Sequence, residues 1–341
     1  MNIYARLSIK DASQVAEARR QAARFSQAAG FDAAMESKVN LIISEMATNL
    51  IKHAAGGEIL LRVIENKDSQ GLDILALDRG PGIAHINDCL RDGFSTAGSY
   101  GNGLGAIYRL SAYCEIYSVL NQGTAVFSRL WNKAPASFAP APEPISFGGV
   151  CVPMPGEELC GDAWAVRQLP DRIIAMMADG LGHGPYAAEA SQAAVEVFNK
   201  NAARGATAGQ LLSYMHSALK STRGAVIAVA EILPASRLVR YAGVGNISGL
   251  IIHPEAGCHM VSLNGTAGGP VRKIQEFIYP WPENALLVMH SDGLATHWRL
   301  DELPVLQRKH PGLIAGILYR DYFRGRDDAG VVVIKEAEST L

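Results

Sequence analysis

The chain has 341 residues, long enough for two ordinary domains that each bury their own core. It carries 31 basic and 33 acidic residues, a formal net charge of −2, and neither sign gathers into a long run. This balance argues against a nucleic-acid-binding surface and against an acidic tail. The first residues lack a basic region followed by an apolar segment, and no stretch approaches membrane-spanning length. We therefore expect a cytoplasmic protein without a membrane anchor.

In the first half of the chain, apolar periodicity predicts two helices, four strands and a third helix. A glycine-rich loop precedes the third helix, and the turn Asn121-Gln122-Gly123 separates the last two strands. In chain order, the predicted elements are helices at about 12–29 and 35–54, strands at 59–65 and 72–78, a helix from about 106, and strands at 114–120 and 124–130.

A proline- and alanine-rich segment lies between Trp131 and Ile145. Its prolines lack backbone donors and favour extended geometry, which is typical of a semi-rigid linker. The sequence therefore predicts an N-terminal domain over residues 1–132, a linker over 133–144 and a C-terminal domain over 145–341.

The second half of the chain predicts strands that surround two helices. The predicted strands are 163–169, 173–178, 225–233, 238–244, 248–253, 285–290 and 331–335, and the helices are 186–199 and 208–219.

The five cysteines are widely scattered and show no Cys-x-x-Cys spacing. This pattern argues against both a disulfide framework and a zinc site. We expect reduced, mostly buried thiols at Cys89, Cys114, Cys151, Cys160 and Cys258.

Polar residues line one edge of the predicted helix 35–54. Glu45, Asn49 and His53 recur every four residues beside an apolar stripe. On its own this triplet is more typical of a solvated helix edge. Two glycine loops follow, Asp78-Arg79-Gly80-Pro81-Gly82 and Gly101-Asn102-Gly103-Leu104-Gly105, and the second leads directly into a helix. Backbone N–H groups at such a helix start can hold phosphate oxygens, and glycine lets the phosphates approach closely.

In this order the motifs resemble the Bergerat ATP-binding fold of gyrase-like ATPases, heat-shock chaperones, histidine kinases and anti-sigma serine kinases. The resemblance covers most of residues 1–132 and implies an α/β sandwich that binds ATP with Mg²⁺. Asn49 would hold Mg²⁺, Asp78 would accept the adenine amino group, and Glu45 would take a proton from an incoming hydroxyl. The remaining implied ATP-binding residues are His53, Gly80, Gly82, Gly101, Gly103, Leu104, Gly105 and Thr124.

The segment 93–98, Gly-Phe-Ser-Thr-Ala-Gly, resembles that of serine/threonine kinases of the RsbT type. The domain is compact and has no helix with a phospho-accepting histidine. These features favour a kinase that acts on a protein over a chaperone-type ATPase.

In the C-terminal half, each of four apolar runs ends at an aspartate motif. The motifs are Gly161-Asp162, Asp179-Gly180, Asp292-Gly293 and Asp327-Asp328. Any single Asp-Gly pair is typical of an ordinary turn. Four carboxylate motifs at strand ends can instead converge on hard divalent cations, which indicates a metal site.

These motifs, together with Gly243-Val244-Gly245-Asn246, resemble the SpoIIE/RsbX branch of the metal-dependent type-2C protein phosphatases over roughly residues 145–337. The resemblance implies a four-layer α-β-β-α sandwich, so the whole chain would be α+β with two domains. It also implies two Mn²⁺ or Mg²⁺ ions that activate a water. Asp162 and Asp179 would be bridging and principal ligands with catalytic roles, Gly180 would offer its carbonyl, Asp292 and Asp327 would complete the site, and Asp328 is a reserve ligand.

Several nearby residues allow more than one interpretation. His183 could be a general acid or a ligand, but between two glycines a turn residue is favoured. Gly330 and His290 stand where that family usually carries other residues. Arg167 and Arg172 could help to bind the substrate phosphate, although solvated strand-end arginines are the more common case.

Together, the two resemblances predict a bifunctional regulator with opposed kinase and phosphatase activities. The implied partners are STAS-type antagonist or stressosome proteins, and relatives of both halves allow a homodimer by analogy. In the alternative interpretation, the phosphatase is the sole chemistry and the N-terminal domain is a nucleotide-dependent docking or sensing module.

Overall fold

The computed structural model describes residues 4–66, 69–89, 103–133 and 145–336. The chain divides into two compact units, Met1–Ala141 and Pro142–Leu341. The predicted linker 133–144 lies outside the described residues apart from Lys133, as do Gly101 and the kinase-like segment 93–98. No helix within the described ranges is long and apolar enough to cross a membrane.

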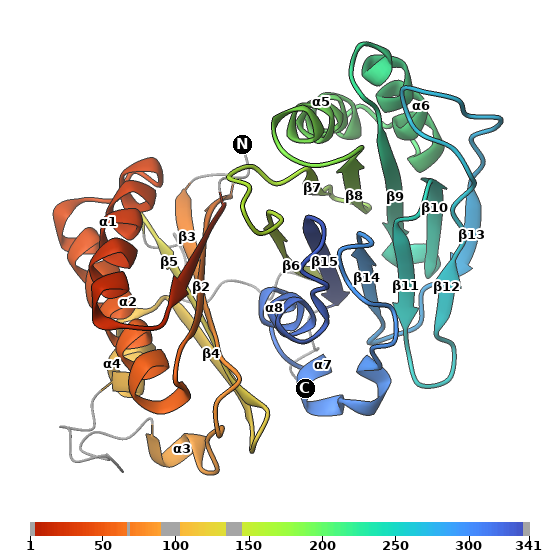
Figure 1. Ribbon diagram of the computed structural model, residues 1–341. Helices are drawn as coiled ribbons and strands as arrows, with labels where there is room; N and C mark the ends of the chain where they lie inside the picture. Colours follow the sequence, from red (N-terminus) through yellow and green to blue (C-terminus); the bar gives the residue numbers. More distant parts are fainter. Residues whose placement is uncertain (1–3, 67–68, 90–102, 134–144, 337–341) are drawn as a thin grey trace. The chain divides into compact units, whose positions relative to one another are not determined.

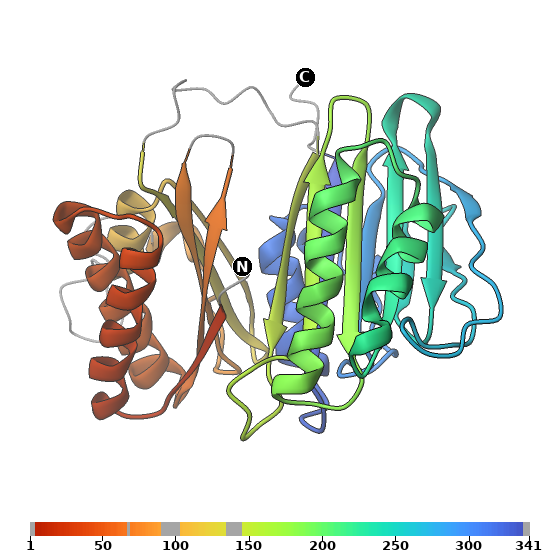
Figure 2. The same cartoon turned by 90° about the horizontal axis from the view of Figure 1, so that it is seen from above.

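The N-terminal unit is an antiparallel five-stranded sheet with its helices on one face (Figure 1). The strand order is β1-β2-β3-β5-β4. Helices α1 and α2 pack against each other and the sheet, and α4 packs beside α2, as the view from above also shows (Figure 2). The elements are β1 (Tyr4–Ile9), α1 (Ala12–Ala28), α2 (Ala33–Ala54), β2 (Gly57–Glu65), β3 (Gln70–Leu77), α3 (Ile86–Cys89), α4 (Gly103–Leu110), β4 (Tyr113–Val119) and β5 (Gly123–Trp131).

Side-chain caps fix where the two long helices begin. Asp11 accepts a hydrogen bond from the Ser13 backbone N–H at 2.8 Å and forms a capping box with Gln14 at the start of α1. Asp32 accepts from the Met35 N–H at 2.8 Å, so α2 begins two residues before its predicted start at 35. Apart from this shift, the structure confirms both predicted helices.

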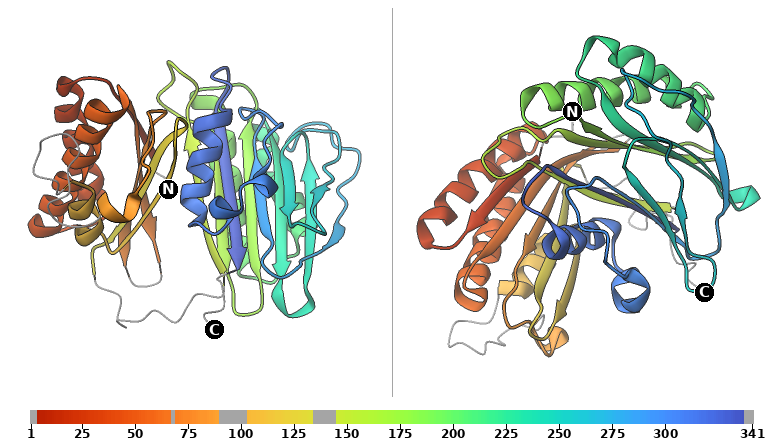
Figure 3. Two further views of the ribbon diagram at one scale, coloured as in Figure 1. Left: turned by 90° about the horizontal axis from the view of Figure 1, so that it is seen from below. Right: turned by 45° about the vertical axis from the view of Figure 1, so that its right-hand side comes forward.

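The C-terminal unit contains two five-stranded antiparallel sheets, ordered β13-β10-β9-β8-β7 and β12-β11-β14-β15-β6. Helices α5 and α6 cover the first sheet, and α8 covers the second (Figure 3). The predicted α+β class with a four-layer α-β-β-α unit is therefore confirmed. The elements are β6 (Ile145–Val152), β7 (Asp162–Gln168), β8 (Ile173–Gly180), α5 (Pro185–Ala202), α6 (Ala208–Ala218), β9 (Ala225–Leu233), β10 (Leu238–Val244), β11 (Ser248–Ile252), β12 (Cys258–Met260), β13 (Phe277–Pro280), β14 (Leu286–His290), α7 (Pro304–Gln307), α8 (Pro311–Tyr322) and β15 (Ala329–Glu336). Short 3₁₀ turns lie at Leu219–Ser221, Pro234–Ser236 and Leu300–Glu302.

Helix α8 was not predicted from the sequence. Residues 311–319 are all buried, so this helix has no polar face and no amphipathic period. It packs closely on β6, where a Cβ on Gly148 would lie only 2.4 Å from the Gly312 nitrogen. Four strands were also missed, because they are short or lie at sheet edges or carry glycines: β1, β6, β12 and β13.

Candidate functional site

Strand pairing gathers the aspartate motifs of the C-terminal unit at one end of its two sheets. Asp162 at the start of β7 pairs with Asp179 at the end of β8 in the ladder of the first sheet. In the second sheet β14 and β15 pair so that His290 lies opposite Val331. The residues just after β14 and just before β15 are therefore neighbours, which brings Asp292 close to the motif Asp327-Asp328.

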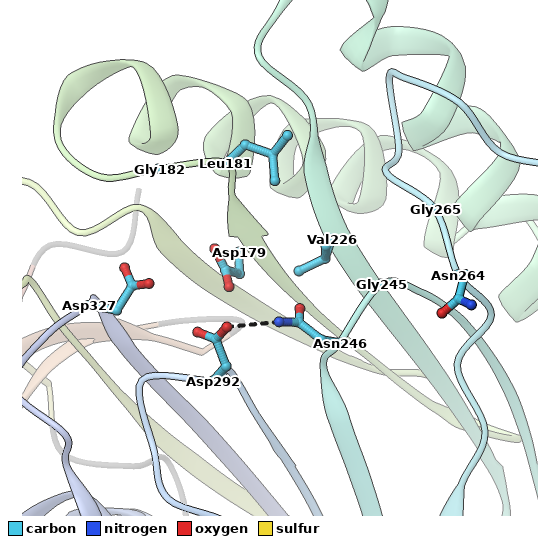
Figure 4. A pocket seen from close by; sticks show the side chains of 10 residues that line it. All are labelled: Asp179, Leu181, Gly182, Val226, Gly245, Asn246, Asn264, Gly265, Asp292 and Asp327. Carbon is cyan, nitrogen blue, oxygen red and sulfur yellow. Dashed lines mark hydrogen bonds between the residues drawn. The ribbon is translucent and has the colours of Figure 1, made fainter.

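Three of these aspartates line a cavity of about 360 Å³ (Figure 4). Asp179, Asp292 and Asp327 surround the same space, and the Asn246 side-chain amide donates a hydrogen bond of 2.8 Å to Asp292. We call this space the aspartate cavity. Its lining residues are Asp179, Leu181, Gly182, Val226, Gly245, Asn246, Asn264, Gly265, Asp292 and Asp327.

Asp162 is buried and pairs with Asp179, but it is not among the residues that line the aspartate cavity. Its Oδ2 accepts a hydrogen bond of 2.5 Å from the Ser291 hydroxyl, which in turn accepts one of 2.9 Å from the Gly330 N–H. A Cβ on Gly330 would lie 3.0 Å from Asp162 Oδ2, so glycine at this position leaves room for the carboxylate. Asp162 Oδ1 is buried and has no hydrogen-bond partner within the described part of the chain.

Asp328 is also outside the cavity lining and acts as a backbone clamp. Its two carboxylate oxygens accept hydrogen bonds of 2.8 Å from the N–H groups of Met154 and Gly161. The two adjacent aspartates therefore have different roles. Asp327 lines the cavity, whereas Asp328 binds the backbone of the loop that leads into β7.

The cavity carboxylates lie in a strongly acidic, partly dehydrated environment. Burial raises the pKa of Asp179 to about 8, and the negative charges of Asp292, Asp327 and Asp328 add to this effect. Burial and the Asp179 charge likewise hold the pKa of Asp162 well above its ordinary value. Burial raises the pKa of Asp328 as well, against the opposing effect of its two backbone hydrogen bonds.

These side chains fit a divalent cation by their chemistry. Aspartate oxygens are the ligands that Mg²⁺ and Mn²⁺ prefer, and a cation would favour the charged form of Asp179, which burial and the neighbouring carboxylates disfavour. No group of three or more His, Cys, Asp or Glu side chains in the described ranges is already gathered tightly enough to hold an ion. The cavity therefore supplies suitable oxygen donors for a cation, and these donors surround a space and do not converge on a single point.

His183 and the two strand arginines lie apart from the cavity lining. His183 Nδ1 lies 2.7 Å from Glu157 Oε1, in keeping with a residue of the exposed turn. Arg172 forms an ion pair of 2.6 Å with the fully buried Glu231, and Arg167 donates to Asn199. Both arginines lie near the β7–β8 turn, at the opposite end of these strands from Asp179. Their position agrees with the favoured interpretation of strand-end arginines and not with a role in binding phosphate.

In the N-terminal unit, the start of α4 faces the polar edge of α2. A Cβ on Gly103 would lie 3.0 Å from Glu45 Oε2 and 3.5 Å from Asn49 Oδ1. Backbone N–H groups at the first turn of α4 thus lie close to both side chains. This arrangement brings an anion-attracting helix start, a carboxylate and an amide to one place.

Asp78 is fixed at the end of β3 by backbone groups. Its Oδ1 accepts hydrogen bonds from the N–H groups of Gly80 at 2.8 Å and Thr124 at 3.0 Å. Gly82 has φ +75° and passes so close to β4 that an added Cβ would lie 2.3 Å from the Val119 carbonyl oxygen. The loop 78–82 therefore requires glycine for both conformation and space.

The other predicted nucleotide-binding residues take different positions. His53 is exposed near the end of α2, whereas Leu104 packs against the hydrophobic core and Gly105 is buried. Thr124 is buried, and its hydroxyl lies 2.9 Å from that of Ser118. Leu104 and Thr124 thus have evident structural roles, and the side chains nearest the start of α4 are Glu45 and Asn49.

Sequence reasoning gave no role to the asparagines of the aspartate cavity. Asn246 belongs to a motif that was recognised, Gly243-Val244-Gly245-Asn246, but its bond to Asp292 depends on the pairing of β11 with β14. Asn264 lies in a loop after β12 and has no local signal that marks it.

The N-terminal unit matches known kinases and ATPase domains. Residues 9–129 match the model of the histidine kinase-like ATPase domain. The chain is 31% identical over 131 residues to the serine/threonine-protein kinase RsbT of Bacillus subtilis, covering 38% of this chain and 98% of RsbT. The chain belongs to the RsbT family. That membership rests on the N-terminal unit, where Glu45, Asn49 and Asp78 lie.

The C-terminal unit matches phosphatases. Residues 170–334 match the model of stage II sporulation protein E, SpoIIE. The phosphoserine phosphatase RsbX of Bacillus subtilis is 26% identical over 141 residues, covering 41% of this chain and 69% of RsbX. The chain thus joins an RsbT-like kinase domain to a SpoIIE-type serine/threonine phosphatase domain.

Solved structures show the same fold for the C-terminal unit. A chain from a study of the bacterial stressosome as a modular system adapted to control secondary messenger signaling has a TM-score of 0.53 and 26% identity, covering 57% of this chain and 100% of that chain. RsbX in complex with magnesium has a TM-score of 0.51 and 21% identity, covering 57% of this chain and 96% of that chain.

Proposed function

We propose that the chain is a bifunctional regulator of a partner-switching pathway. A kinase domain, residues 1–132, phosphorylates serine or threonine on a STAS-type antagonist or stressosome protein, and a phosphatase domain, residues 145–341, removes phosphate. The observation that carries the phosphatase half is the meeting of Asp179, Asp292 and Asp327 around one cavity in a SpoIIE-type fold. The similarity to RsbT over nearly its whole length supports the kinase half.

In the phosphatase domain, Asp179, Asp292 and Asp327 would hold divalent cations, Mn²⁺ or Mg²⁺, together with the backbone carbonyl of Gly180. Such ions, when bound, supply Lewis acidity and a water of lowered pKa. Asn246 keeps one Asp292 oxygen in a fixed direction through its 2.8 Å hydrogen bond. This outer contact orients the ligand in the way that partners of metal ligands generally do.

In this proposal Asp162 and Asp328 stabilise the cavity without lining it. Asp162 binds Ser291, which precedes Asp292, and Asp328 binds the Gly161 N–H, next to Asp162. Each hydrogen bond joins a segment of one sheet to a segment of the other, so the two bonds fix the relative position of the two sheets at the cavity. Asp162 also keeps one buried oxygen without a partner, which is available to a cation or its water.

In the kinase domain, Glu45 would take a proton from the hydroxyl of a protein substrate. Asn49 would hold Mg²⁺ and Asp78 would accept the adenine amino group of ATP. The start of α4 supplies backbone N–H groups for phosphate oxygens beside Glu45 and Asn49. General-base catalysis of this kind requires hydrogen-bond reach between the carboxylate and the attacking hydroxyl.

The test uses an Asp179→Asn variant of the full chain, incubated with γ-labelled ATP, Mg²⁺ and purified STAS-type proteins. Wild-type chain and Mn²⁺ are added afterwards. Label that is transferred to the STAS protein and then released would establish both activities on one substrate. If the variant binds ATP but transfers no label, the kinase assignment fails for these partners, and the N-terminal domain is better described as a docking or sensing module.

A further inference from the structure

An exposed arginine lies at the mouth of the aspartate cavity, outside the set of residues that line it. Arg223 follows the 3₁₀ turn Leu219–Ser221 and precedes β9. A Cβ on Gly182, which lines the cavity, would lie 3.3 Å from Nη1 of Arg223. The guanidinium group is therefore in direct reach of the rim formed by the loop after Asp179.

The backbone around Arg223 is fixed. Asp179 lies opposite Val226 in the ladder between β8 and β9, and the Leu181 N–H donates a hydrogen bond of 3.1 Å to the Gly224 carbonyl. Gly224 has φ +83°, and an added Cβ would lie 2.6 Å from the Ala267 carbonyl oxygen. The backbone that carries Arg223 is thus fixed and is joined to the strand of Asp179. A residue that positions a ligand requires such a fixed backbone.

The side chain of Arg223 is also held in place by an aromatic ring. Its Cζ lies 4.8 Å from the centre of the Tyr186 ring, which is 62% exposed. A guanidinium stacked on a ring keeps its N–H donors in the plane free for a second partner. Over the described ranges, Arg223 forms no ion pair with a carboxylate, in contrast to Arg172 in its bond with Glu231.

The negative charge of the cavity indicates a role for this arginine. The cavity beside Arg223 is lined by three aspartates, Asp179, Asp292 and Asp327. A phosphate monoester that enters this acidic space is itself an anion, so cations must offset the repulsion. Metal ions held by the aspartates would do so in part. Arginine at the rim supplies planar, paired N–H donors that match phosphate oxygens.

We propose that Arg223, held on the Tyr186 ring, binds the phosphate group of the phosphatase substrate at the mouth of the aspartate cavity. This proposal rests on the proposed phosphatase function. It replaces Arg167 and Arg172, which lie at the far end of their strands. It assigns to Arg223 a role in binding the substrate phosphate, and none in activating water.

The experiment measures phosphate binding to the full chain loaded with Mn²⁺ by isothermal titration calorimetry, with inorganic phosphate as the probe. Arg223→Ala removes the guanidinium, and Arg223→Lys keeps a charge but not the paired donors. We expect phosphate to bind about tenfold more weakly to Arg223→Ala, since hydrogen bonds to charged groups carry this much affinity, and Arg223→Lys to lie between. Arg204→Ala, another exposed arginine in the turn after α5, is the matched control and should bind phosphate as the wild type does.

Kinetics with p-nitrophenyl phosphate separate this proposal from the phosphatase assignment. Metal-dependent hydrolysis by the wild type tests the phosphatase function alone. If that holds, Arg223→Ala should raise KM and the inhibition constant of phosphate by similar factors. Phosphate affinity within twofold of wild type in both Arg223 variants would overturn the proposal, and so would a fall in kcat with KM and phosphate affinity unchanged. If the wild type binds phosphate but does not hydrolyse the ester, the phosphatase function is contradicted. The role of Arg223 is then tested by the phosphate affinities of the variants alone.

Discussion

Replacing Asp179 by asparagine should stabilise the metal-free phosphatase unit. In the folded chain, the pKa of Asp179 is raised from 3.8 to about 8, first by burial and then by the neighbouring aspartates. The folded state therefore binds more protons than the unfolded state between about pH 4 and pH 8. Stability attributable to this group is greatest at low pH and is lost as the pH rises through that window.

The size of the effect follows from the same shift. A change of about four units at 1.36 kcal/mol each sets an upper bound of about 6 kcal/mol. Because side chains relax and water enters such sites, we expect Asp179→Asn to stabilise the fold by about 2–4 kcal/mol at pH 8. For a unit of this size that corresponds to a rise in Tm of about 5–10 °C. At pH 5 the gain should shrink to roughly a third, since little of the pKa difference is then expressed.

Thermal melts of the full chain in EDTA, at several values between pH 5 and pH 8, measure this gain. The relevant transition is the one that Mn²⁺ shifts in the wild type, and Mn²⁺ should no longer shift it in the variant. Asp171→Asn, at the exposed turn between β7 and β8, is the matched control and should leave Tm unchanged at every pH. A variant that melts at or below the wild-type temperature at pH 8, or a gain that does not depend on pH, would refute the electrostatic reasoning.

Three further outcomes are expected. Glu45→Gln should lower phosphotransfer at least about 100-fold while ATP still binds in a filter assay, whereas Glu36→Gln on the same helix should have little effect. Asn246→Ala should weaken Mn²⁺ binding about tenfold by calorimetry, because Asp292 loses its 2.8 Å partner; unchanged affinity would contradict this. Asp328→Ala should lower Tm in EDTA, since the buried Gly161 N–H and the partly buried Met154 N–H lose their acceptor, at about 1–3 kcal/mol for a buried group; a higher Tm would show that charge repulsion dominates there as well.

The sequence was informative where local pattern and tertiary role coincide. The ends of β8 and β14 could be located because apolar runs stop close to Asp179 and Asp292. Antiparallel pairing then places the start of β7 beside the end of β8, and the start of β15 beside the end of β14. The cap at Asp32 is also a local signal, but the predicted helix began after it, at residue 35. The sequence could therefore predict that the aspartate motifs meet in pairs at strand ends, whereas the meeting of the two pairs depends on the stacking of the two sheets.

The sequence could not distinguish the roles of neighbouring acids. Asp327 and Asp328 are adjacent and chemically identical, and their roles are separated only by the Met154 and Gly161 N–H groups, far away in the chain. Helix α8 escaped recognition for a related reason, because tertiary burial on all sides removes the period that marks a helix. Arg223 resembles any exposed arginine until its contacts with Tyr186 and Gly182 are known.

The acids at this site thus divide into two groups with opposite effects on the metal-free fold. Asp179 faces other carboxylates, so its charge opposes folding until a cation arrives. Asp328 accepts two backbone hydrogen bonds, so although burial raises its pKa as well, its carboxylate oxygens hold the loop before β7 in place whether or not a cation is present. Such a cavity keeps its shape without metal, and metal binding relieves the repulsion between its carboxylates. Opposite changes in Tm for Asp179→Asn and Asp328→Ala, measured in the same EDTA buffer, would be the direct signature of that division.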